Sequence, residues 1–179
     1  MRTILLAALA ATALSAGGTR TIDATRSKAA FEVTHVFVEH VSGMVPIASG
    51  NVVLRQDSAI PVSAAAVLDA TRLESGDPDR DDSLRSPDFF DTKRFPTWTF
   101  ASTKIVPKGD AAFEMDGILT IHGVAQPERL DVTVSGDAAN PSYRATARID
   151  RHAFGMSTTR LDPAIGGMVD VTLDITLKP

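Results

Sequence analysis

The densest group of side chains that could do chemistry lies within residues 75–103. It contains an acidic and basic cluster of Asp79, Arg80, Asp81, Asp82, Arg85 and Asp88. Two carboxylates held by an arginine could serve general acid–base catalysis. The same stretch carries two helix-start signals, Asp77-Pro78 and Ser86-Pro87, and acidic residues in a first helical turn are favoured by the helix dipole. Two short helices account for most of these charges, so we interpret the cluster as caps and ion pairs that hold a crossover in place.

Histidines could provide metal ligands or general bases, and the chain has four: His35, His40, His122 and His152. They lie far apart, and neither HExxH nor a comparable spacing occurs, so no metal site is predicted. His122 precedes a glycine and fits a hairpin turn. His35 shares a predicted strand face with Phe31 and Val33, which leaves two interpretations open: a polar group inside an apolar cavity, or a hydrogen-bonded core histidine. No GxSxG, P-loop or dinucleotide fingerprint is present, so catalysis is not indicated.

The remaining constellation is apolar and rich in aromatic rings. Its members are Phe31, Val33, Phe89, Phe90, Phe95, Trp98, Phe100, Leu119, Ile121, Phe154 and Met156. These residues could fill a core or line an apolar pocket. A filled core and an apolar pocket have the same amino-acid composition, so these residue types alone do not distinguish the two interpretations.

Alternating strands must position these side chains. After Pro96, Trp98 and Phe100 fall on one face of a strand. The last segment has the clearest alternation, with apolar residues at every second position from Val169 to Leu177. A slip of one residue would expose that whole face, so its register is well specified. About eight short strands separated by turn signals predict an antiparallel sandwich or barrel, and an eight-stranded barrel is either filled or holds one small ligand.

Composition narrows the class of protein. The 179 residues are enough for one domain with a sizeable core, and 44% hydrophobic and 22% charged residues are ordinary for a globular chain. The net charge of −4 and the absence of a Lys/Arg run argue against a nucleic-acid partner. With no cysteine, a disulfide, an iron–sulfur cluster and a thiol nucleophile are excluded.

The N-terminus has the pattern of a signal peptide. Arg2 precedes an apolar run over residues 4–14, and small residues follow. That run is short of the roughly 20 residues that span a bilayer, so no stable membrane span is expected. An uncleaved anchor or a buried helix is the alternative. We therefore expect residues 1–18 to be removed and residues 19–179 to form one exported, soluble domain in the periplasm.

Several of these residues also occur, in the same order, in a known family. They are Ile22-Asp23, Ser27, Phe31, Val33, His35, Gly43, Gly50, Asp79-Arg80-Asp81, Leu84-Arg85-Ser86, Asp88-Phe89-Phe90-Asp91, Phe95-Pro96-Thr97, Phe100-Ala101-Ser102-Thr103, the run from Gly117 to Val124, Pro127, Arg151, Phe154 and Gly155. Across essentially its whole mature length the chain resembles the YceI-like family of exported lipid-binding proteins. It departs from the family at Met44-Val45, where an aromatic residue is usual, and between Phe37 and Gly43.

The resemblance implies a fold and a function. The fold is all-β, an extended eight-stranded antiparallel lipocalin-like barrel with a short helical crossover. The activity is non-catalytic binding or transport of a polyisoprenoid, an isoprenoid quinone or a similar amphiphilic lipid, with no other cofactor. The expected ligand site comprises Phe31, Val33, His35, Phe89, Phe90, Phe95, Trp98, Phe100, Leu119, Ile121, Phe154 and Met156.

Two alternatives and the assembly stay open. The first alternative is an exported barrel enzyme, of isomerase or hydrolase type, that uses His35 and an acidic residue in the cavity. The second is a binding module whose barrel is filled by side chains. The assembly is expected to be a monomer or a homodimer.

Overall fold

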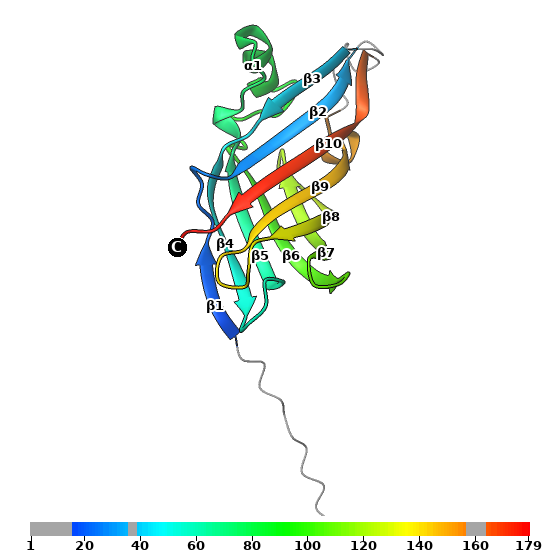
Figure 1. Cartoon of the computed structure of the whole chain (residues 1–179). Helices are drawn as coiled ribbons and strands as arrows, with labels where there is room; N and C mark the ends of the chain where they lie inside the picture. The colour runs from blue at the N-terminus through cyan, green and yellow to red at the C-terminus, as the bar shows by residue number, and fades with distance from the viewer. Residues whose placement is uncertain (1–15, 36–38, 157–163) are drawn as a thin grey trace, which may run out of the picture.

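A single antiparallel sheet, strongly curled, dominates the molecule (Figure 1). The structure, a computed structural model, describes residues 16–35, 39–156 and 164–179. Its ten strands are β1 (Ala16–Thr21), β2 (Lys28–His35), β3 (Glu39–Met44), β4 (Ile47–Arg55), β5 (Pro61–Asp69), β6 (Thr97–Pro107), β7 (Ala112–Ile121), β8 (Val124–Ser135), β9 (Ser142–Asp150) and β10 (Ile165–Thr176). Its helical segments are η1 (Ala70–Arg72), α1 (Pro78–Arg85) and η2 (Arg151–Phe154). The strands lie in the order β1-β4-β5-β6-β7-β8-β9-β10-β2-β3.

The sheet curls into a half-barrel whose two ends are tied together by the backbone. Ile22, just after β1, donates its N–H to Gly50 O on β4 over 2.9 Å and forms a bridge with Leu177 at the end of β10. Val45, between β3 and β4, donates to Ala29 O on β2 over 3.0 Å. The Ile22–Leu177 bridge and the Val45–Ala29 bond thus join the two halves of the curled sheet.

The predicted fold class is confirmed: the chain forms an antiparallel, barrel-like sheet with one helical crossover. There are ten strands where eight were expected. The two edge strands β1 and β3, AGGTRT and EHVSGM, are short and have little apolar alternation, which is why the pattern understated the number. Residues 16–18 of the predicted signal peptide begin β1, whereas the rest of that peptide and residues 36–38, including Phe37, lie outside the described residues.

One helix forms in the crossover, not two. Asp77 caps α1, and its carboxylate accepts the N–H groups of Asp79 and Arg80. A second helix was predicted from Ser86-Pro87, and this prediction is wrong. The following segment folds back onto the end of α1 instead: Phe90 N–H donates to Leu84 O at 3.0 Å, and the N–H groups of residues 91 and 92 donate to carbonyls of residues 86 and 85. Bonds to the last carbonyls of α1 take the place of a new helical turn.

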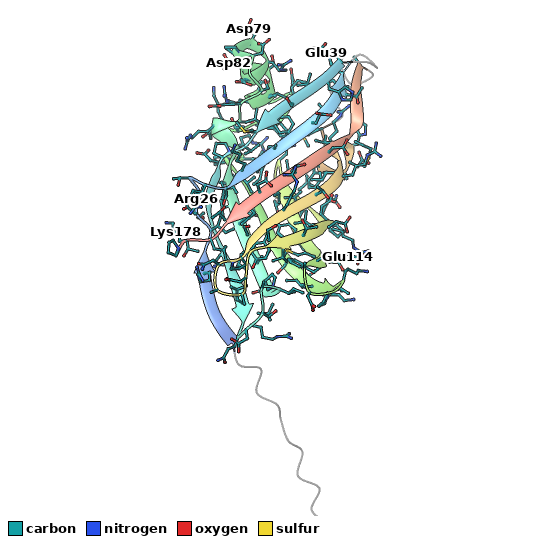
Figure 2. The ribbon with its side chains drawn as sticks, viewed as in Figure 1. Arg26, Glu39, Asp79, Asp82, Glu114 and Lys178 are labelled. Atoms are coloured by element: carbon teal, nitrogen blue, oxygen red, sulfur yellow. The ribbon has the colours of Figure 1, made fainter. Side chains whose placement is uncertain are left out.

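Charged and apolar side chains separate to the two faces of the sheet. Figure 2 shows labelled charged side chains such as Glu114 and Lys178 at the outer surface. Cross-strand pairs neutralise much of that face, among them Arg129–Asp116 at 2.6 Å. Inside lie two apolar clusters, one around Phe113 and one beneath the crossover around Trp98. Among the described residues no helix is long and apolar enough to cross a membrane.

Candidate functional site

The interior of the half-barrel contains two adjoining apolar compartments. The inner compartment encloses about 120 Å³ and the outer one, beneath the crossover, about 290 Å³. Both are lined by the same five residues where they meet: Phe31, Trp98, Ile121, Ile149 and Val171. Along β10 the lining runs from Ile175 in the inner compartment to Val169 in the outer one, roughly 20 Å of strand at about 3.3 Å per residue. The two compartments together form one elongated cavity.

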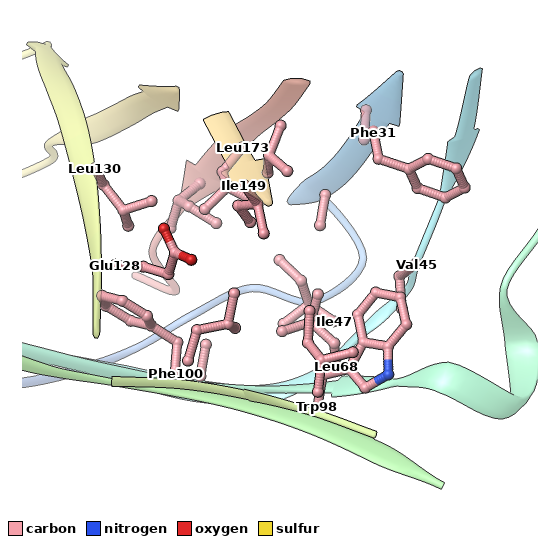
Figure 3. A pocket seen from close by; sticks show the side chains of 17 residues that line it. Phe31, Val45, Ile47, Leu68, Trp98, Phe100, Glu128, Leu130, Ile149 and Leu173 are labelled. Carbon is pink, nitrogen blue, oxygen red and sulfur yellow. The ribbon is translucent and has the colours of Figure 1, made fainter. Parts of the chain in front are cut away.

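The inner compartment is apolar apart from one residue (Figure 3). The sheet supplies its lining through the inward positions of its strands: Ala29, Ala30, Phe31, Val45, Ile47, Ala66, Leu68, Trp98, Phe100, Leu119, Ile121, Glu128, Leu130, Ile149, Val171, Leu173 and Ile175. Glu128, on β8, is the one ionisable side chain in that set. Its carboxyl group lies among Phe100, Leu130 and Ile149 in Figure 3.

The outer compartment lies between the sheet and the crossover. Its lining is Phe31, Val33, His35, Val41, Arg80, Ser83, Leu84, Phe89, Phe90, Trp98, Ile121, Ile149, Arg151, Met156, Ile165, Val169 and Val171. The ring of Phe90 packs against Trp98 with a centroid distance of 4.6 Å, so the crossover contacts the sheet directly above the junction of the two compartments. Polar groups are concentrated here, in contrast to the inner compartment.

Two glycines allow aromatic rings to lie flat in this wall. A Cβ atom at Gly117 would overlap the ring of Phe100, and one at Gly43 would overlap the ring of Phe31. Gly43 faces Phe31 across the β2–β3 pair, and Gly117 lies two residues before Leu119, the partner of Phe100 on β7. The missing side chains at Gly43 and Gly117 therefore leave room for the Phe31 and Phe100 rings in the cavity wall.

The charged cluster of the crossover is a structural anchor. Asp81 is buried, and its Oδ1 accepts the N–H of Ser75 at 2.6 Å and the hydroxyl of Ser75 at 2.5 Å. The Ser75 hydroxyl, together with the Ser75 N–H and the nearby arginines, holds the pKa of Asp81 below its usual value. Arg85 donates to Leu73 O at 2.5 Å. This geometry agrees with the interpretation of caps and ion pairs, since the carboxylate is used to fix α1 to the segment after η1.

Arg151 anchors the opposite side of the outer compartment. This buried arginine, at the start of η2, donates to the carbonyls of Gly166 and Ile165 at 2.9 Å each and also to the carbonyl of Met156. Carbonyls on both sides of one connection thus converge on a single guanidinium. It thus holds the start of β10 to the residues that follow η2, beside the outer compartment.

Ten of the twelve predicted site residues line the cavity. They are Phe31, Val33, His35, Phe89, Phe90, Trp98, Phe100, Leu119, Ile121 and Met156. Phe95 lies elsewhere, packed edge-on against His122 with a centroid distance of 5.0 Å. Phe154 is fully buried in the cluster beneath the crossover, and its carbonyl lies 3.4 Å from Nδ1 of the same histidine. The Phe95 ring and the Phe154 carbonyl thus both contact His122 in the β7–β8 turn. Whether the other ten residues contact a ligand stays a prediction.

The list missed Glu128 and most of the aliphatic lining. The alternation of inward and outward positions along the strands could have identified both. Val171, Leu173 and Ile175 follow the period of the last strand, and Leu130 and Val132 set the inward face of β8. Two residues before Leu130, the same period reaches Glu128. A charged residue at an inward position was the feature to notice.

Burial sets the electrostatics of Glu128. Loss of solvation, and secondarily the negative charge of Asp150, raise the pKa of the Glu128 carboxyl above its usual value. Within the described part of the chain, this carboxyl makes no hydrogen bond or ion pair that could offset the cost. An unpaired carboxyl in an apolar wall is therefore the most polar group available to a molecule in the inner compartment.

The histidines make separate contacts at the rim and surface. His35 Nδ1 lies 3.7 Å from Glu39 Oε2, His40 pairs with Glu32 at 3.1 Å and His152 Nδ1 lies 3.2 Å from Asp150 Oδ1. Among the described residues, no three His, Asp or Glu side chains converge in a way that could hold a metal ion. His35 lies in the outer compartment, so of its two interpretations the polar group in an apolar cavity fits the geometry.

A family model and curated relatives both match this chain over most of its length or over a large part of it. A family model described as the YceI-like domain matches residues 21–177. A UPF0312 protein of Vibrio parahaemolyticus is 30% identical over 154 residues, which cover 83% of this chain and 78% of the relative. A UPF0312 protein of Vibrio vulnificus is 33% identical over 111 residues, and the match spans 62% of this chain and 59% of that protein.

Solved structures share the fold. BcnA of Burkholderia cenocepacia superposes with a TM-score of 0.74 at 24% identity, covering 86% of this chain and 98% of that one. A polyisoprenoid-binding domain from Saccharophagus degradans superposes with a TM-score of 0.67 at 15% identity, covering 88% and 97%. At these identities the likeness shows the fold alone.

Proposed function

The chain belongs to the YceI-like family, and from this premise we propose that it is a non-catalytic binding protein that carries an amphiphilic lipid. The hydrocarbon chain of the lipid would occupy the inner and outer compartments. One observation carries the proposal: the elongated cavity has a single ionisable residue among the 17 that line its inner part. A site of this shape and polarity suits an extended apolar chain.

Burial of apolar surface supplies the affinity. Each isoprene unit adds five carbons, or about 4 kcal/mol at about 0.8 kcal/mol per buried CH₂. Three or four buried units would contribute about 12–16 kcal/mol. After several kcal/mol of association cost this corresponds to affinity near micromolar or tighter.

Polyisoprenoids and isoprenoid quinones are the proposed ligand class. Support comes from the Saccharophagus degradans domain, a structural neighbour described as polyisoprenoid-binding. The wall supports it as well, since branched aliphatic side chains and the rings of Phe31, Trp98 and Phe100 offer an apolar surface to a methyl-branched chain. The head group would lie in the outer compartment, where Arg80 and His35 are available to meet it.

We further propose that the protein is exported and works in the periplasm. The support is the N-terminal pattern of Arg2, an apolar run and small residues. A carrier in an aqueous compartment between membranes needs a cavity that shields a lipid chain from water.

A pair of variants on β7 tests the carrier proposal. Leu119 lines the inner compartment, while its neighbour Ile118 points outward and is 40% exposed. Leu119→Glu adds a charge to the cavity wall, and Ile118→Glu adds the same charge to the surface. Delipidated protein is titrated with geranylgeraniol, and the single tryptophan, Trp98, reports occupancy because it lines both compartments.

Wild type and Ile118→Glu should show saturable changes in Trp98 fluorescence and a one-to-one complex by native mass spectrometry, whereas Leu119→Glu should show neither. Circular dichroism checks that each variant is folded. Should Leu119→Glu fail to fold, Ala66→Met fills the inner compartment without adding charge. Equal binding by cavity and surface variants would contradict the proposal. Measurable turnover lost in His35→Ala, with lipid binding intact, would favour the enzyme alternative.

A further inference from the structure

Glu128 is the ionisable residue of the inner compartment, and a pure hydrocarbon ligand does not explain it. It occupies an inward position of β8, between Gln126 and Leu130, in a wall that is otherwise apolar. Figure 3 shows its carboxyl group directed into the compartment between Leu130 and Ile149. A leucine at this position would complete the apolar wall, so packing of the wall does not explain why a carboxyl group is present.

No structural role accounts for it. The pairing of β8 with β9 ends at Asp131, which pairs with Thr146. Glu128 lies beyond that point, so it has a paired strand neighbour on β7 but none on β9. Its partner across β7 is Gly117, which has no side chain to offer. The next residue, Arg129, bonds to Asp116 on the outer face at 2.6 Å. Within the described residues, no donor is directed at the Glu128 carboxyl.

The charged groups on the neighbouring elements do not compensate for it either. On β7, Asp116 is held by Arg129. At the end of β9, Asp150 repels the Glu128 carboxylate, and His152 at η2 lies 3.2 Å from Asp150. The raised pKa of Glu128 expresses this cost. A half-buried carboxyl with an unmet acceptor is stabilised most directly by a ligand that donates to it.

We propose that the lipid of the carrier model bears a hydrogen-bond-donating hydroxyl group on the part of its chain that enters the inner compartment, and that the carboxyl of Glu128 accepts this bond. The inference rests on the proposed function and names the ligand class more narrowly. A hydroxyl suits the site because it can donate to the carboxylate and can also pair with the neutral acid. The preferred ligand is therefore polar at both ends: a head group lies beneath the crossover, and a hydroxyl lies at Glu128.

Matched ligands isolate this hydrogen bond. A long-chain primary alcohol and the α,ω-diol of the same length differ by one terminal hydroxyl. Their dissociation constants are measured through Trp98 fluorescence, over a series of chain lengths, for wild type, Glu128→Leu and Glu128→Gln. Asp131→Leu removes a carboxylate from an exposed, outward position of the same strand and serves as the matched control. The cost of desolvating the second hydroxyl is common to all four proteins and cancels in the comparison.

The quantity compared is the preference for diol over alcohol. At the chain length that reaches Glu128, this preference should fall about 10- to 100-fold in Glu128→Leu, the range expected for a hydrogen bond to a charged group. Glu128→Gln keeps an acceptor oxygen and should retain part of the preference. Asp131→Leu should match wild type.

Two other results would distinguish failure of the hydroxyl inference from failure of the carrier proposal. If the alcohol binds saturably but wild type and Glu128→Leu show the same diol preference at every length, the hydroxyl inference is wrong and the carrier proposal stands. If neither alcohol nor diol binds to wild type at any length, the carrier proposal fails and the hydroxyl inference fails with it.

Discussion

Removing the Asp81 carboxylate should loosen the crossover far more than the same change at the next residue. Asp81 is 8% exposed, and its Oδ1 accepts two hydrogen bonds from Ser75, at 2.6 and 2.5 Å. Asp82, on the same helix, has a side chain that is 86% exposed and contacts Arg85 at 3.3 Å. Asp81→Ala and Asp82→Ala therefore remove equal atoms from a buried and a surface position.

The expected magnitudes differ several-fold. A hydrogen bond to a charged group contributes about 1.5–3 kcal/mol, and the buried Ser75 N–H loses its acceptor when Asp81 is truncated. Asp81→Ala should thus lower the free energy of unfolding by about 3–5 kcal/mol. Asp82→Ala should change it by about 0.5 kcal/mol or less, because an exposed ion pair contributes little.

Equilibrium urea unfolding at neutral pH measures both free energies, and limited proteolysis locates the change. Cleavage within residues 74–92 should accelerate in Asp81→Ala only. The pKa of Asp81 is lowered on folding, so its stabilisation is present above the usual value of 3.8 and is lost as pH falls through the lower folded value. Equal unfolding free energies for Asp81→Ala and Asp82→Ala would refute the anchoring role.

Two further predictions concern the tyrosine and the crossover. The hydroxyl of Tyr143 donates to Ala59 O at 2.8 Å, and burial raises the pKa of this tyrosine to about 12. The absorbance of its phenolate should thus appear near pH 12, and the free energy of unfolding should fall as pH rises from about 10 to 12. Tyr143→Phe should remove this pH dependence and lower the free energy of unfolding by about 1 kcal/mol. Titration of Tyr143 near pH 10 would contradict its burial. Phe90→Ala, which removes the ring 4.6 Å from Trp98, should speed ligand dissociation measured by stopped-flow fluorescence. Phe95→Ala, which alters a ring outside the cavity lining, should leave that rate unchanged, and a similar rate in both variants would argue against the crossover as a cover.

Periodicity carried most of what could be predicted. In a curled sheet the two faces have opposite environments, so a two-residue period in β10 or β6 assigns each side chain to the inside or the outside. Phe31, Val33 and His35 were placed on one face by this rule, and all three line the outer compartment. Ten of the twelve predicted site residues lie in the cavity wall, and those on strands do so because inward positions face the same interior.

The predictions were wrong in segments outside the strands, where the two-residue alternation of side chains gives no information. Ser86-Pro87 has the letters of a helix start, but the carbonyls at the end of α1 take the hydrogen bonds that a second helix would need. Phe95 and Phe154 are attached to a turn and to η2, and their directions depend on tertiary packing against His122. Composition likewise could not distinguish a filled barrel from a hollow one, since that depends on how far the facing walls stand apart.

Identification of what the native protein holds tests the central claim most directly. The mature protein would be purified without detergent and weighed by native mass spectrometry, and any bound molecule would be extracted with solvent and identified. The account predicts a stoichiometric adduct that proves to be an amphiphilic lipid with a long apolar chain. A bare polypeptide mass, unchanged after incubation with polyprenols, isoprenoid quinones and long-chain alcohols, would contradict it.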